Sequence, residues 1–239
     1  MALSAHDQAF WRQYAQTYAM LYGILPVQEA LKHVVWAAGI TSHSNVLDVG
    51  CGTGFLMRVL TEFFGIWPQI TGLDHTAEML DVARAVPYAG SFKPVLADLN
   101  RPHTEWDLDG QTYDRLVANN SLYAVDSPVS VLRELLSVAA VNARLVVSTP
   151  RPEASIQAVV SEHLRMFTVR GGSSDDEARR VVELFADIRR INERILANER
   201  FHFPDSGELE DWFFRSGWRL TSVRTTYAGQ NWLAVANRG

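Results

Sequence analysis

The fold is decided by the stretch Asp48-Val49-Gly50-Cys51-Gly52-Thr53-Gly54, in which three glycines follow an acidic residue at every second position. Residues 45–49 are typical of a short buried strand, and residues 55–64 repeat apolar side chains with a helical period. The glycines therefore fall where the chain reverses between a strand and a helix. Glycine permits the dihedral angles of a tight turn and lets backbone N–H groups approach a ligand, and the N-terminus of the next helix favours an anionic group. This stretch predicts a bound small cofactor.

The spacing of the glycines bears on the identity of that cofactor. A dinucleotide fingerprint is spaced G-x-G-x-x-G, whereas the glycines here are Gly50, Gly52 and Gly54, which weakens the case for a pyrophosphate. The pattern resembles the first motif of class I S-adenosylmethionine-dependent methyltransferases of the small-molecule type. This resemblance implies that the loop, with Cys51 inside it, faces the methionyl end of the cofactor, and that Asp48 helps to hold the loop and the cofactor ammonium.

Two further acids follow the next predicted strands. Residues 69–74 are typical of a second buried strand that ends in Asp74, 20 residues beyond Gly54. This is the expected place for a carboxylate that accepts hydrogen bonds from both ribose hydroxyls. A third strand over 92–96 leads to Asp98, and the resemblance implies that this side chain accepts a hydrogen bond from the adenine amino group. The other residues that the resemblance places at the cofactor are His75, Met79, Leu99 and Asn119.

The acceptor is expected at the end of a fourth strand, which begins at Tyr113 and leads to the pair Asn119-Asn120. Methyl transfer is an in-line displacement on an activated donor, so the main task of the protein is positioning. A hydroxyl or acidic carbon acceptor would also need a base, for which His163 is the first candidate. An amine acceptor would need only hydrogen bonds that position it. The candidate catalytic residues are His163, Tyr14, Tyr18, Asn120 and Tyr123.

Three of these predictions have structural alternatives. His75 either packs on the adenine face or is an exposed residue at a helix start. His163 interrupts the apolar face of a predicted helix, so it is either a base or a buried core residue. Tyr14 and Tyr18 belong to an aromatic stripe near the N-terminus; the stripe either covers the cofactor, since aromatic rings stabilise a cation such as a sulfonium, or attaches its helix to the core.

The elements together predict an α/β fold: a seven-stranded, mostly parallel, Rossmann-like methyltransferase sheet with an antiparallel C-terminal strand. We expect a single domain over residues 1–239. Its predicted parts are an N-terminal helical lid (1–44), a cofactor-binding core (45–150), a helical cap inserted after the fifth strand (151–204), and a C-terminal helix and hairpin (205–239). Before the fifth strand, Val141-Asn142-Ala143 stands where the family commonly has a Lys-Pro-Gly-Gly turn, so a different turn geometry is expected there.

Composition limits the partners. The 239 residues are 47% hydrophobic and suit one globular domain. The formal net charge is −5 without a dense run of Lys or Arg, which argues against nucleic acid or an anionic membrane as a partner. The single cysteine, Cys51, excludes an intramolecular disulfide and fits a reducing cytoplasm. We expect a cytoplasmic monomer or homodimer with a small-molecule acceptor, and we assign no metal ligands.

The resemblance implies an enzyme that transfers a methyl group from S-adenosylmethionine to an O, N or C atom of a small molecule, with S-adenosylhomocysteine as product. The biosynthesis of a specialised metabolite is one setting for such a reaction. Three alternatives stay open: an enzyme that uses the same cofactor for cyclisation or aminocarboxypropyl transfer, a binding module without turnover, and an NAD(P)-dependent oxidoreductase. The short-chain type of the last would carry Tyr-x-x-x-Lys, but neither Lys32 nor Lys93 has a tyrosine four positions earlier.

Overall fold

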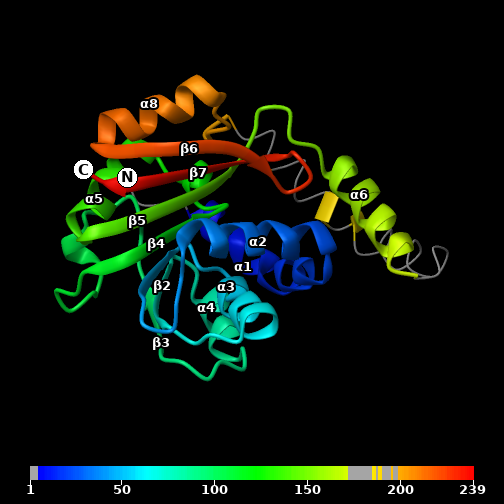
Figure 1. Ribbon diagram of the computed structural model, residues 1–239, viewed down its shortest axis with the longest axis horizontal. Helices are drawn as coiled ribbons and strands as arrows, with labels where there is room; N and C mark the ends of the chain where they lie inside the picture. The colour runs from blue at the N-terminus through cyan, green and yellow to red at the C-terminus, as the bar shows by residue number, and fades with distance from the viewer. Residues whose placement is uncertain (1–4, 172–184, 187, 190–194, 196–198) are drawn as a thin grey trace.

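The computed structural model of the protein describes residues 5–171, 185–186, 188–189, 195 and 199–239. Within them, one seven-stranded sheet has the strand order β3-β2-β1-β4-β5-β7-β6 (Figure 1). Neighbouring strands from β3 to β5 are parallel, and β7 is antiparallel to both β5 and β6. This confirms the predicted sheet. The strands are β1 (Asn45–Val49), β2 (Gln69–Asp74), β3 (Phe92–Leu96), β4 (Tyr113–Asn119), β5 (Ala139–Pro150), β6 (Trp218–Thr226) and β7 (Asn231–Arg238).

Helices cover both faces of the sheet because successive residues of each central strand point to opposite sides. Val46 of β1 belongs to one buried cluster and Leu47 to the other. The first cluster contains apolar residues of α2, α3 and α4, and the second contains those of α5 and α8. The helices are α1 (Ala5–Met20), α2 (Leu25–Ala38), α3 (Phe55–Val59), α4 (Ala77–Arg84), α5 (Pro128–Ser137), α6 (Ile156–Val169) and α8 (Ser206–Ser216).

Local signals account for several helix ends. Pro26 lies in the first turn of α2, and the helix ends at Gly39, whose φ of 63° is left-handed. A capping box starts α8: the Asp205 side chain accepts a hydrogen bond from the Glu208 backbone, and the Glu208 side chain accepts one from the Asp205 backbone. The predicted helix over 55–64 begins as α3 and continues as a π-helical turn over Leu60–Phe64.

The segment before the fifth strand differs from the expected turn. Strand β5 begins at Ala139, so Val141-Asn142-Ala143 lies inside it. The pairing with β4 jumps from Tyr113↔Ala139 to Arg115↔Arg144, which leaves several more residues on β5 than on β4. A bulge therefore takes up the extra residues, and Val141 at its tip is 81% exposed.

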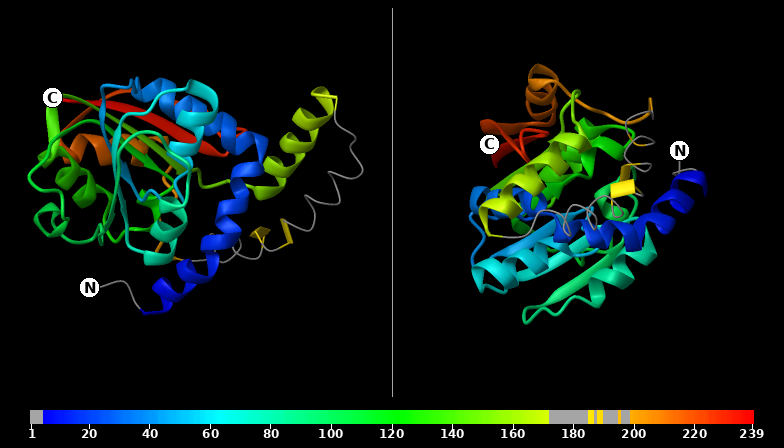
Figure 2. Two further views of the ribbon diagram at one scale, coloured as in Figure 1. Left: turned by 90° about the horizontal axis from the view of Figure 1, so that it is seen from below. Right: turned by 90° about the vertical axis from the view of Figure 1, so that its right-hand side faces the viewer.

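The described parts of residues 1–44 and 151–204, where a lid and a cap are predicted, lie near the carboxyl ends of the parallel strands. Helix α1 crosses this edge of the sheet, and α6 packs against α2 and extends away from the sheet (Figures 1 and 2). Residues 175–198 of the predicted cap fall largely outside the described residues; those described from this range include Phe185, Ile188 and Ile195, which are buried. Across the described ranges, no helix has both the length and the apolar character needed to cross a membrane.

Candidate active site

The glycine loop after β1 is held in a conformation that requires glycine. Gly50, Gly52 and Gly54 have φ values of 71°, 53° and 81°. A Cβ on Gly50 would lie 2.4 Å from the Cβ of Ser121, and a Cβ on Gly52 would lie 3.3 Å from Cε1 of Tyr18. The loop backbone therefore lies directly against the segment after β4 and against helix α1.

Gly54 has a different role from the other two glycines. A Cβ at this position would lie 2.7 Å from Cε of Met57 and 3.2 Å from Cγ2 of Val86, next to α4. Gly54 also precedes the first residue of α3. The structure thus places Gly54 in the packing of α3 against α4, whereas the sequence predicted a cofactor contact.

Asp74 connects the loop to the next element. Its Oδ2 accepts a hydrogen bond from the Gly52 backbone N–H at 2.9 Å, and its Oδ1 accepts one from the Thr76 N–H at 2.9 Å. Burial raises the pKa of this carboxyl group, and His75 and the two backbone donors offset part of the effect. Each carboxylate oxygen has a second lone pair, so Asp74 can still accept hydrogen bonds from a ligand.

A pocket of about 670 Å³, part of it open to solvent, adjoins the loop. We call it the glycine-loop pocket. Of the residues predicted at the cofactor, it contains Gly50, Gly52, Asp74, His75, Met79, Asp98 and Leu99. Its other lining residues are Trp11, Tyr18, Thr76, Asn100, Asn120, Ser121, Tyr123, Ala124 and Val125.

The polar atoms of this pocket fit a ligand rich in hydroxyl and amino groups. His75 Nε2, Thr76 Oγ1 and Ser121 Oγ are buried and have no hydrogen-bond partner among the described residues. Buried polar atoms are nearly always paired in folded proteins, so these three are available to a bound molecule. S-adenosylmethionine carries ribose hydroxyls, an adenine and an amino acid end, and it supplies the matching groups.

Asp48 lies beneath the loop in a small cleft with Cys51 and Asn119. Its residue surface is 4% exposed. Burial, and to a lesser extent the nearby charge of Asp74, raise the pKa of Asp48 to about 7. A cationic group in the cleft would favour the ionised carboxylate, which suits the ammonium contact implied for Asp48. Asn119 belongs to this cleft and to the second pocket, described next, rather than to the glycine-loop pocket.

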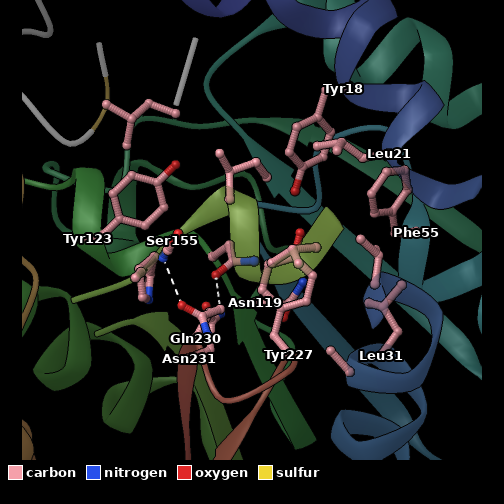
Figure 3. A pocket seen from close by; sticks show the side chains of 18 of the residues that line it. Tyr18, Leu21, Leu31, Phe55, Asn119, Tyr123, Ser155, Tyr227, Gln230 and Asn231 are labelled. Carbon is pink, nitrogen blue, oxygen red and sulfur yellow. Dashed lines mark hydrogen bonds between the residues drawn. The ribbon is translucent and has the colours of Figure 1, made fainter. Parts of the chain in front are cut away.

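The second pocket lies between α1, α2, α6 and the β6–β7 turn, and Figure 3 shows it from close by. We call it the tyrosine pocket; its volume is about 880 Å³, including a part open to solvent. The described lining residues carry no charged side chain. They are Tyr14, Tyr18, Leu21, Val27, Ala30, Leu31, Phe55, Asn119, Asn120, Tyr123, Pro150, Ala154, Ser155, Ile156, Val159, Ile195, Phe203, Tyr227, Gln230 and Asn231.

The two pockets share three lining residues, Tyr18, Asn120 and Tyr123. The structure thus brings four of the five candidate catalytic residues to the tyrosine pocket, since Tyr14 lines it as well. Burial raises the pKa of Tyr14, Tyr18 and Tyr123 above the ordinary value of 10. Their hydroxyls are therefore protonated at neutral pH and act as hydrogen-bond donors rather than as bases.

Asn120 is held by a buried polar network. Its φ of 55° is left-handed, and its backbone N–H donates to the Ser148 carbonyl at 2.8 Å. Nδ2 of Asn231 donates to Asn120 Oδ1 at 2.6 Å and to Ser148 Oγ at 3.0 Å. Asn231 and Ser148 are 2% and 1% exposed. This network fixes the orientation of the Asn120 amide where the two pockets meet.

His163 lies away from both pockets. It is 1% exposed on α6, and its Nδ1 accepts a hydrogen bond from the Leu25 backbone N–H at 3.1 Å. This contact ties α6 to the first turn of α2, where a backbone donor has no partner within the helix. The position of His163 favours the structural alternative over the predicted base.

Sequence reasoning missed a second set of lining residues. The sequence could have indicated Trp11 as a lining residue, because Trp11 belongs to the aromatic stripe of the N-terminal helix. No sequence pattern indicated Tyr227, Gln230 or Asn231. These residues belong to the turn between β6 and β7 and the start of β7, more than 100 residues from Asn120 in the sequence. Only the pairing of β7 with β5 brings them to the site.

Comparisons with known proteins agree with this geometry. Residues 40–193 match a family model described as a methyltransferase domain. A demethylmenaquinone methyltransferase of Staphylococcus epidermidis is 26% identical over 202 residues, which cover 83% of this chain and 77% of the relative. A ubiquinone biosynthesis O-methyltransferase of Bordetella bronchiseptica is 28% identical over 185 residues, which cover 76% and 74%.

The fold also matches solved structures. The magnesium protoporphyrin IX methyltransferase of Synechocystis with bound SAH has a TM-score of 0.62 at 15% identity, with 99% of this chain and 100% of that chain covered. This likeness concerns the fold, and the family model supplies the assignment because it spans more than half of the chain. The chain therefore belongs to the methyltransferase domain family and is a class I S-adenosylmethionine-dependent methyltransferase.

Proposed function

We propose that this enzyme methylates an O, N or C atom of an aromatic small molecule bound in the tyrosine pocket. The observation that carries the proposal is that the glycine-loop pocket and the tyrosine pocket meet at Tyr18, Asn120 and Tyr123. A donor in the first pocket and an acceptor in the second would approach each other at these residues. Relatives are named for quinone biosynthesis, which supports an aromatic acceptor.

Aromatic walls favour a planar acceptor. Tyr18 stacks on Phe55 with ring centroids 5.0 Å apart, and Tyr123 stacks on Phe203 at 5.8 Å. All four residues line the tyrosine pocket. Flat rings with fixed orientations bind another flat ring by stacking and edge contacts, so these pairs would set the plane of the acceptor.

Residues of the glycine-loop pocket, and Asp48 in the cleft beneath the loop, would each contact a different part of the cofactor. Asp74 would accept hydrogen bonds from the ribose, Asp98 would contact the adenine, and Asp48 would face the ammonium. When bound, S-adenosylmethionine supplies a methyl group activated by its cationic sulfonium. The protein contributes alignment: Asn120, fixed by Asn231, and the tyrosine rings orient the acceptor and exclude water.

The same donor site would also serve the alternative chemistries. Aminocarboxypropyl transfer or cyclisation differs only in which carbon beside the sulfur is attacked, and a binding module would produce nothing. We retain the division into lid, core, cap and C-terminal unit, a cytoplasmic monomer or homodimer, and a partner set without nucleic acid or membrane as parts of the proposal.

Product analysis tests the proposal. The protein is incubated with methyl-labelled S-adenosylmethionine and a panel of hydroxylated and aminated aromatic compounds, and products are identified by mass spectrometry. We expect a labelled methylated product together with S-adenosylhomocysteine. Formation of 5′-methylthioadenosine would show attack on the aminocarboxypropyl chain instead; a modified acceptor would then indicate transfer, and an unmodified acceptor cyclisation. Cofactor binding without any product across the panel would show a binding module. Asp74→Ala should weaken cofactor binding by more than about 1 kcal/mol, because ribose hydrogen bonds are lost.

A further inference from the structure

Tyrosine hydroxyl groups gather in the tyrosine pocket. Tyr14, Tyr18, Tyr123 and Tyr227 all line it, and Figure 3 shows Tyr18, Tyr123 and Tyr227 from three different elements around the same space. Tyr18 comes from α1, Tyr123 from the segment after β4, and Tyr227 from the β6–β7 turn. Burial, and to a lesser extent the nearby Tyr123 and Tyr227, raise the pKa of Tyr14 and Tyr18, which agrees with the closeness of the four side chains.

Three of these hydroxyls have no acceptor in the described part of the protein. Tyr18, Tyr123 and Tyr227 make ring contacts or backbone hydrogen bonds, but no hydrogen bond joins their hydroxyls to any described residue. Elsewhere in the fold, tyrosine hydroxyls are paired: the buried Tyr113 donates to Thr71 Oγ1 at 3.2 Å, and the half-buried Tyr88 donates to the Pro68 carbonyl at 2.7 Å. Unpaired donors that face one cavity indicate a ligand that carries acceptor oxygen.

Two of the three rings, those of Tyr18 and Tyr123, are held in place by aromatic neighbours. Tyr18 stacks on Phe55. Tyr123 stacks on Phe203, and its carbonyl accepts a hydrogen bond from the His202 N–H at 2.8 Å. These contacts limit the movement of the two hydroxyls toward other partners.

Tyr227 sits in a strained turn. Its φ is 55° and that of Ala228 is 53°, a left-handed conformation that costs energy for residues other than glycine. The turn is tied to the end of β5: Gln230 O accepts from the Arg151 N–H at 3.0 Å, and Gln230 Oε1 accepts from the Ser155 N–H at 2.7 Å. Strain that persists beside a ligand pocket points to a functional constraint on Tyr227.

The charges around the pocket define what these donors can bind. Burial raises the pKa of Tyr18, Tyr123 and Tyr227, so all three stay protonated and donate. Asp48 and Asp74, on the donor side, also raise the pKa of Tyr18 and would oppose an anion. The cationic sulfonium and ammonium of the bound cofactor offset them. Neutral tyrosine donors in an apolar site stabilise an oxyanion in the same way as an oxyanion hole.

We propose that the hydroxyls of Tyr18, Tyr123 and Tyr227 bind an acceptor oxygen as an oxyanion, and that the substrate is an acidic phenol or enol that enters the tyrosine pocket already deprotonated. This inference rests on the proposed methyl transfer. The proton of the acceptor is lost to water before binding. In the transfer, a lone pair of the oxyanion, or of the carbon conjugated with it, forms the bond to the methyl carbon while the carbon–sulfur bond breaks and its electrons stay on sulfur. No protein base is needed in this step.

A chromogenic probe tests the oxyanion directly. 4-Nitrophenol absorbs visible light only as the phenolate, so its ionisation on the protein can be followed by spectrophotometric titration. The donor site is saturated with sinefungin, an unreactive analogue in which an amine cation takes the place of the sulfonium. We expect the phenolate to bind more tightly than the phenol, which lowers the apparent pKa of the bound probe. Tyr227→Phe should weaken phenolate binding by about tenfold or more, the effect of one lost hydrogen bond to a charged group, and Tyr18→Phe by a similar factor. Neither substitution should change the binding of 4-nitrotoluene, which has a methyl group in place of the phenol oxygen.

The control variant is Tyr88→Phe, which removes a hydroxyl outside the pocket and should leave probe binding unchanged. Three results would each overturn the inference: a bound probe that stays in the phenol form, no binding of the phenolate where 4-nitrotoluene binds, or unchanged phenolate affinity in Tyr227→Phe. Methylation of amines alone, without phenolate binding, would overturn it while the proposed function stands. Phenolate binding without methylation of any acceptor would instead contradict the proposed function.

Discussion

At the scale of single residues, Gly50 carries the tightest contact of the glycine loop. In Gly50→Ala the new Cβ meets Ser121 at 2.4 Å on a backbone with φ 71°. We expect a cost of about 1–2 kcal/mol from the left-handed backbone and about 1–3 kcal/mol more from overpacking. Cofactor affinity should fall by at least about tenfold, because the loop must shift. Chemical denaturation and calorimetry with S-adenosylhomocysteine measure the two effects.

Gly65→Ala is the matched control. Gly65 has a φ of 61°, and a Cβ there would meet nothing within 4 Å. It should show the backbone cost alone, with unchanged cofactor affinity. Equal losses of affinity in both variants would contradict the assignment of Gly50 to the cofactor site.

Asp48 makes stability depend on pH. Its ordinary pKa of 3.8 is raised to about 7 in the folded protein, so between these values the folded state binds a proton that the unfolded chain has lost. The contribution of Asp48 to the free energy of unfolding therefore falls as pH rises from about 4 to above 7. Asp48→Asn removes this group, so its stability relative to the wild type should increase from pH 5 to pH 8, as measured by urea unfolding.

Asp211→Asn is the control for this prediction, because it replaces an exposed carboxylate on α8. Its free energy of unfolding should differ from that of the wild type by an amount that changes little between pH 5 and pH 8. Asp48→Asn should also lose the increase in S-adenosylhomocysteine affinity that we expect in the wild type as pH rises through 7, because the ammonium favours the ionised carboxylate. Parallel stability curves for Asp48→Asn and the wild type would refute the raised pKa.

At the scale of elements, helix α1 contributes two side chains to the glycine-loop pocket, Trp11 and Tyr18. Trp11 lines the glycine-loop pocket and meets His75 edge-on, with ring centroids 6.4 Å apart. We expect Trp11→Ala to weaken cofactor binding by about 3- to 10-fold, since such an aromatic contact contributes about 0.5–1.5 kcal/mol beyond area burial. Calorimetry with S-adenosylhomocysteine measures the change.

Two neighbours on α1 serve as controls. Gln16 is exposed, and Gln16→Ala should leave affinity unchanged. Arg12 pairs with Glu78 of α4 at 2.7 Å, but the two side chains are 62% and 40% exposed, so Arg12→Ala should have only a small effect. A larger effect of Arg12→Ala than of Trp11→Ala would assign closure of α1 to the ion pair instead.

At the scale of the whole molecule, the C-terminal strand completes a site that begins more than 100 residues earlier. Asn231→Ala leaves Asn120 Oδ1 and Ser148 Oγ without the Nδ2 donor. We expect a loss of about 1–3 kcal/mol in stability, the cost of unsatisfied buried groups. With the Asn120 amide released, the KM for the acceptor should rise and kcat should fall, while the affinity for S-adenosylhomocysteine stays unchanged. Steady-state kinetics and calorimetry separate these effects.

Asn237→Ala provides the comparison on the same strand. Asn237 accepts a hydrogen bond from Arg144 Nε at 3.4 Å, at the opposite end of β7 from the site. It should cost some stability without changing the KM for the acceptor. If Asn231→Ala matched Asn237→Ala in kinetics, Asn231 would have no positioning role.

The sequence by itself determined the sheet, the glycine loop and the class of cofactor. These features depend on short-range patterns: strands of alternating or continuous apolar residues, glycines where the backbone must be left-handed, and acids at successive strand ends. Each pattern spans a few residues, and the order of parallel strands then places Asp48, Asp74 and Asp98 at one edge. Local patterns predicted a cofactor contact for Gly54 but did not show its place between α3 and α4, because the direction of its missing Cβ depends on how these helices pack.

Only the tertiary structure decided which residues line the tyrosine pocket. His163 and Tyr227 illustrate the reason: the first sits on the apolar face of a helix and the second in a turn, and neither position tells which distant surface the side chain meets. Packing of α6 on α2 places His163 against Leu25, and the pairing of β7 with β5 brings Tyr227 and Asn231 beside Asn120. These contacts join segments more than 100 residues apart. They follow from the packing of the whole chain, and the periodic pattern of a short stretch of sequence does not predict them.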